Sequence, residues 1–142
     1  MALGLNTTMA YSFTGFFVVG SKSRPECLPK GTIWRKVTSP FQGIAALLPP
    51  NLGHKIGLEE IRVVGNDTAD DSDWMFLRYE TWGGKIDFVY GLGSAGGEDF
   101  GPVEDSEDDT VETTYEELLR RIGIAPEHSR NFAPFERDFF AK

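Results

Sequence analysis

The stretch WMFLRYETWGGKIDFVYGL, residues 74–92, decides the fold class. Its first half alternates, so a strand would carry two different faces. One face holds Met75, Leu77 and Tyr79, and the other holds Trp74, Phe76, Arg78 and Glu80. The pair Gly83-Gly84 suits a tight turn that needs positive φ. The return strand has an apolar face of Ile86, Phe88, Tyr90 and Leu92. The stretch therefore predicts a β-hairpin.

Upstream of the hairpin, the chain reads as further strands separated by loops. Residues 11–19 and 32–38 are rich in aromatic and β-branched side chains, which favours strands. Residues 43–48 form a short apolar run that fits a buried strand or a short helix. Residues 58–64 are equally ambiguous, and their Ile and Val content leans towards strand. We expect residues 66–73 to form an acidic loop.

Downstream, residues 107–122 are the clearest helix, because one apolar stripe recurs at helical spacing. The stripe consists of Val111, Tyr115, Leu118, Leu119 and Ile122. Ser106 is the expected N-cap, and Gly123 is the expected C-terminal stop. Residues 91–101 are predicted as a glycine-rich loop, followed by an edge strand at 100–103. In the Phe-rich tail, residues 132–140, Pro134 could open a last short helix.

These elements predict an α+β fold with a mostly antiparallel sheet. One amphipathic helix, at about residues 107–122, and a short C-terminal helical segment would pack on that sheet. The 142 residues fit a single domain spanning residues 1–142. Residues 1–10 are expected to be an extension outside the fold, since patterning starts at Tyr11.

Cysteine content and hydropathy favour the cytoplasm. Cys27 is the one cysteine, so no internal disulfide can form. The N-terminal residues lack the basic and apolar regions of a secretory signal. No stretch approaches the ~18–20 apolar residues that a membrane span needs. The oligomeric state is left open.

Charge is unevenly distributed along the chain. Residues 1–65 hold seven Lys/Arg and three Asp/Glu, a balance of +4, whereas residues 66–142 hold seven and nineteen, a balance of −12. Ten acids and no base lie between Glu98 and Leu119. Such a segment disfavours nucleic acid and anionic membranes as partners, because phosphate binding depends on Lys and Arg.

Common catalytic and cofactor patterns are incomplete. Residues 91–96, GLGSAG, match a dinucleotide-binding string, but the acids and Gly101-Pro102 after it do not open a helix. Cys27 and the histidines, His54 and His128, lie in separate predicted loops, which disfavours a catalytic pair or a zinc site. We therefore predict no catalytic residue, metal or cofactor.

The favoured hypothesis is a non-catalytic acidic protein that neutralises or regulates a basic protein partner, as inhibitors and immunity proteins do. The predicted partner-binding residues are Glu98, Asp99, Glu104, Asp105, Asp108, Asp109, Glu112, Trp74 and Phe76.

Two alternatives remain open. The first is a small enzyme or ligand-binding domain with a pocket between sheet and helix, in which Glu80 and Asp87 are the carboxylates and Arg78 and Tyr90 add polar groups. The second is a subunit or scaffold whose Phe-rich tail docks on another protein.

Overall fold

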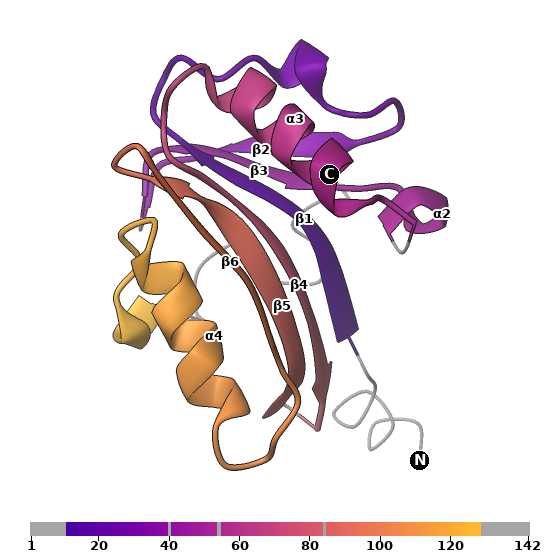
Figure 1. The fold of residues 1–142 in the computed structure, drawn as a ribbon, viewed down its shortest axis with the longest axis vertical. Coiled ribbons are helices and arrows are strands. Elements are labelled where there is room, and N and C mark those ends of the chain that lie inside the picture. The colour runs from indigo at the N-terminus through magenta and orange to yellow at the C-terminus, as the bar shows by residue number, and fades with distance from the viewer. Residues whose placement is uncertain (1–10, 40, 54, 84, 129–142) are drawn as a thin grey trace.

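A six-stranded antiparallel sheet with helices on both faces forms the fold, which confirms the α+β prediction (Figure 1). The computed structural model describes residues 11–39, 41–53, 55–83 and 85–128. The strand order is β2-β3-β1-β4-β5-β6. The strands are β1 (Tyr11–Val19), β2 (Ile33–Val37), β3 (Gly43–Leu47), β4 (Trp74–Trp82), β5 (Lys85–Ala95) and β6 (Glu98–Asp105).

Two longer helices cover the sheet, α3 (Leu58–Ala69) and α4 (Val111–Arg120). Shorter helical turns are η1 (Pro25–Cys27), α2 (Pro50–Gly53) and η2 (Pro126–His128). None of the helices in the described ranges has the length and apolar character that crossing a membrane requires. The predicted N-terminal extension and the predicted C-terminal helical segment lie outside the described residues.

The central strand β4 is buried on both of its faces, and its predicted alternation is confirmed. Met75, Leu77 and Tyr79 pack in one core cluster with the apolar stripe of α4. Trp74 and Phe76 pack in a second cluster that includes Ile61 of α3. Figure 1 shows α3 and α4 on opposite sides of the sheet. One helix therefore closes each core.

The return strand β5 departs from simple alternation near its start. Glu80 pairs with Phe88 whereas Thr81 pairs with Ile86, so Asp87 is an extra residue at a register shift. As a result Ile86 belongs to the α4-side cluster, while Phe88 pairs across the strands with Glu80. The prediction that Ile86 and Phe88 share one face was wrong, because alternation in sequence does not reveal a bulge.

The expectation of a strand at residues 58–64 was wrong, since this segment opens helix α3. Its buried residues, Ile61, Gly65, Thr68 and Ala69, recur at helical spacing. Two acids, Glu59 and Glu60, occupy the first turn, where the helix dipole favours negative charge. The predicted acidic loop is also shorter than expected, because α3 continues to Ala69 and ends at a left-handed Asp70.

The helix predicted at 107–122 is present but begins later, at Val111, with Thr110 as its N-cap in place of Ser106. The predicted glycine-rich loop is largely strand, because β5 runs to Ala95 and β6 begins at Glu98. Gly93 belongs in this strand because a Cβ there would lie 2.1 Å from the Trp74 carbonyl oxygen. The ambiguous run at 43–48 forms strand β3 between β1 and β2.

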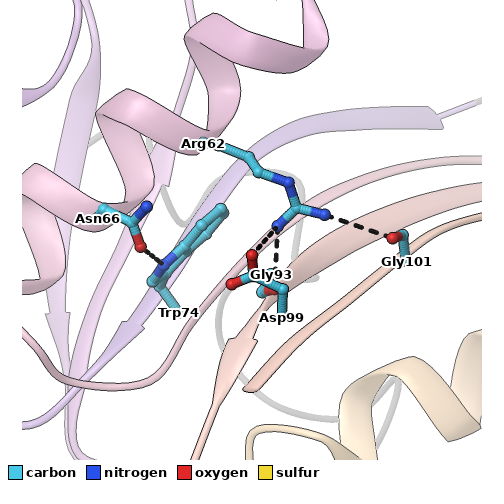
Figure 2. A network of polar contacts seen from close by, with 6 residues as sticks. All are labelled: Arg62, Asn66, Trp74, Gly93, Asp99 and Gly101. Atoms are coloured by element: carbon cyan, nitrogen blue, oxygen red, sulfur yellow. Dashed lines mark hydrogen bonds and ion pairs between the residues drawn. The ribbon is translucent and has the colours of Figure 1, made fainter. Parts of the chain in front are cut away.

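Gly65 allows α3 to lie directly against the indole ring of Trp74. A Cβ built on Gly65 would come within 2.4 Å of that ring. The next residue, Asn66, accepts a 3.0 Å hydrogen bond from Trp74 Nε1, so the buried indole N–H is satisfied (Figure 2). This contact sets the distance between α3 and the sheet.

We expect Gly65→Ala to destabilise the fold by about 1–3 kcal/mol, since the new methyl group forces the helix away from Trp74. This cost exceeds the ~1 kcal/mol that alanine gains over glycine in a helix. Urea denaturation measures the difference. Val63→Ala, at a position 59% exposed on the same helix, should stay within about 0.5 kcal/mol of the wild type. An unchanged or raised stability for Gly65→Ala would contradict the contact.

Candidate functional site

The predicted acidic residues follow one margin of the sheet. Glu98, Asp99 and Glu104 lie on β6, which is the last strand of the sheet and pairs with β5. Asp108 and Asp109 lie in the connection from β6 to α4, and all five side chains are exposed. Glu112 follows, half-buried in the first turn of α4. We call these six residues the acidic margin.

Asp105 has a structural role, in hydrogen bonds within the chain, and is not part of the acidic margin. Its carboxylate accepts hydrogen bonds from the Thr114 hydroxyl at 2.6 Å, the Thr110 hydroxyl at 2.8 Å and the Glu107 backbone N–H at 2.9 Å. These bonds, the one from Thr114 foremost, hold the pKa of Asp105 below its usual value near 3.8. Asp105 thus joins the end of β6 to the start of α4.

Trp74 and Phe76, the two aromatic residues predicted to contact a partner, are buried in the core and do not form an exposed surface. Trp74 is 1% exposed and Phe76 is 2% exposed. Helix α3 covers this sheet face. The apolar side chain that remains exposed along β6 is Val103, at 39%.

A groove of about 370 Å³ runs between β6 and α4, next to the acidic margin. Its apolar lining comes from Phe100, Val103 and Leu118, and its polar lining includes Glu117, Arg120 and Arg121. The Arg121 guanidinium lies over the Phe100 ring, 5.0 Å from the ring centre. The charged lining of the groove therefore comes from the second half of α4 and the residue after it, where Glu117 lies close in sequence to Arg120 and Arg121.

Arg62 of α3 neutralises part of the margin and ties α3 to β5 and β6 (Figure 2). It donates hydrogen bonds of 3.3 Å to the carbonyl oxygens of Gly93 and Gly101, and lies 3.8 Å from the Asp99 carboxylate. The Asp99 side chain is 64% exposed, so water screens this ion pair and Asp99 still faces solvent.

A second and smaller cavity, of about 180 Å³, lies beside α3 on the opposite sheet face. Its lining includes Ile56, Ile61, Phe76, Arg78, Phe88, Tyr90 and Glu104. Arg78 and Tyr90, the polar residues named in the pocket hypothesis, both line this cavity as cross-strand neighbours, but the helix beside it is α3 and not the predicted helix at residues 107–122.

Glu80 and Asp87, the carboxylates expected in such a pocket, are absent from its lining. Glu80 lies two residues beyond Arg78 along β4, and Asp87 is the extra residue at the register shift. Ile56 and Phe88 were missed as pocket residues. Only the docking of the segment before α3 against the sheet could have identified Ile56.

Other reactive groups are dispersed. Across the described ranges, no three His, Cys, Asp or Glu side chains gather as a metal site. Cys27 is a free, half-buried thiol in η1. His54 lies outside the described residues, so its position relative to Cys27 stays a prediction.

Replacing Asp105 by alanine should lower the melting temperature at neutral pH. A depressed folded-state pKa gives stability that is present above the unfolded pKa, near 3.8, and is lost as the pH falls through the lower folded-state value. The difference from wild type should therefore be full at about pH 7 and shrink below about pH 3.8, as circular dichroism melts can show. Asp108→Ala, at an exposed neighbour, is the control. An equal difference at low pH would contradict this role.

No protein-family model matches this chain, and no curated protein or solved structure is detectably similar to it. What the protein binds must therefore be inferred from the charge, shape and burial of its own surface.

Proposed function

We propose that this is a non-catalytic binding protein whose acidic margin recognises a basic protein partner and thereby neutralises or regulates it. The observation that carries the proposal is the acidic margin itself, with five exposed carboxylates on the edge strand β6 and the connection after it, and no Lys or Arg between Glu98 and Leu119. An edge of one sign attracts an oppositely charged protein and speeds its association.

The opposite margin of the sheet has the reverse character. Strand β2 carries Arg35 and Lys36, and it lies at the other end of the strand order. A basic partner is therefore repelled from β2 and directed towards β6. This polarity supports recognition at one defined edge rather than a general attraction to an acidic protein.

The groove beside the margin supplies the apolar contact that charge alone lacks. Exposed ion pairs contribute little binding energy, whereas buried anchors in a well-packed pocket dominate interfaces. Val103 stands at the junction of margin and groove, with Phe100 and Leu118 behind it. A partner that places an apolar side chain there would bring its basic residues towards Asp108 and Asp109, in the connection that leads into α4.

Neutralising the margin tests the charge contribution. A variant with Glu98→Gln, Glu104→Gln, Asp108→Asn and Asp109→Asn should lose the partner that the tagged wild type captures from its native lysate at low salt. Asp105 stays unchanged because it is structural. A matched variant neutralises Glu26, Glu59, Glu60 and Asp67, which are exposed elsewhere, with the same change in net charge. A partner retained equally by both variants would contradict recognition at the margin.

Val103→Ser tests the apolar contribution. Loss of this contact should weaken binding of the captured partner about tenfold, chiefly through faster dissociation measured by surface plasmon resonance. Val63→Ser, on the exposed side of α3, should leave affinity unchanged. Equal effects of the two substitutions would place the interface away from the groove.

A further inference from the structure

The cavity beside α3 is built around one cross-strand row of polar residues. Thr14, Arg78, Tyr90 and Glu104 are successive register partners on β1, β4, β5 and β6. In the neighbouring row, Phe76 pairs with Phe16 and Leu92, and all three are buried in the α3-side core. The polar row thus lies at the edge of the covered area, where the sheet face opens.

Arg78 is the residue of this row that has a buried hydrogen-bond donor without an acceptor. Its guanidinium lies over the Phe88 ring, 5.1 Å from the ring centre, which leaves the donors in the guanidinium plane for another group. Its Nε atom is buried and has no hydrogen-bond partner. The ion pairs of Arg24 with Asp70 and of Arg62 with Asp99 do not involve Arg78.

A buried donor without an acceptor costs free energy, most of all when it is charged. An incoming oxyanion would remove that cost, and a carboxylate matches the planar guanidinium by accepting two parallel hydrogen bonds. The Tyr90 hydroxyl, from the adjacent position on β5, can add a further polar contact.

The remaining walls restrict the rest of the ligand. Ile56, Ile61 and Phe76 make one side of the cavity apolar, which favours a hydrocarbon or aromatic group beside the carboxylate. Glu104 lines the cavity on the β6 side, and its negative charge repels any ligand charge that is not paired with Arg78, so a second carboxylate is disfavoured. A volume of about 180 Å³ limits the ligand to a small molecule.

We propose that this cavity binds a small organic monocarboxylate with an apolar body, with Arg78 holding the carboxylate and Phe76, Ile56 and Ile61 contacting the body. The site is separate from the proposed protein interface, except that Glu104 borders both. The test therefore leaves Glu104 unchanged.

Sodium phenylacetate is the probe, and amide chemical shifts of the full-length protein are the measurement. We expect saturable shifts at Phe76, Phe88 and Tyr90, with a dissociation constant in the range of roughly 1–10 mM for so small a ligand. Two compounds separate the contributions of charge and shape. 2-Phenylacetamide has the same shape without charge and should bind at least about tenfold more weakly. Inorganic phosphate lacks the apolar body and should cause no saturable shift at these residues.

Arg78→Gln should weaken phenylacetate binding at least about tenfold, and Arg35→Gln, on β2, should leave it unchanged. The spectrum of Arg78→Gln without ligand shows whether this variant folds. If it does not fold, the comparison of phenylacetate with its amide on the wild type decides. Equal binding of acid and amide, unchanged binding to a folded Arg78→Gln, or no saturable shift with phenylacetate would each overturn the proposal.

Discussion

The contact between Gly65 and the Trp74 indole is the constraint on which the arrangement of this protein depends. β4 buries both faces, so each face needs its own cover, and α3 can cover the Trp74 face only by approaching it closely. Glycine permits that approach, and the bond from Trp74 Nε1 to Asn66 fixes its direction. Arg62, one turn before Asn66, then reaches the carbonyl oxygens of Gly93 and Gly101 and ties the helix to the β5–β6 edge.

The length of α3 and its distance from the sheet also determine which part of this sheet face stays uncovered. Trp74 and Phe76 lie in the α3-side core, whereas Arg78, two residues further along the same face of β4, is only half-buried. Beyond the helix, the guanidinium rests on Phe88 and its Nε has no protein acceptor. The same docking that completes the core therefore creates a polar opening at its border, and such an opening is where a small ligand could satisfy groups that the chain itself does not.

The two proposed sites both include residues of β6 but lie on opposite faces of the sheet. Along β6 the side chains alternate, so Glu104 faces the Arg78 cavity while Val103, paired with Gly91, faces the groove beside α4. Asp105 contributes to neither surface, because its carboxylate already accepts three hydrogen bonds within the chain. Acidic residues that are close in sequence are thus divided among an exposed margin, a cavity wall and the hydrogen-bonded joint between β6 and α4.

The sequence by itself determined the elements with a clear period and the distribution of charge. The alternation in β4, the hairpin, the apolar stripe of α4 and the acidic segment after Glu98 all follow from local spacing, and the α+β class follows from them. Tertiary structure alone decided that residues 58–64 form a helix. A short apolar run there fits the spacing of a helix or of a strand, and packing of α3 on Trp74 selects the helix. It also decided the bulge at Asp87, the burial of Trp74 and Phe76, and the meeting of Arg78 with Ile56 and Glu104. These depend on contacts between residues far apart in the chain, which local spacing does not encode.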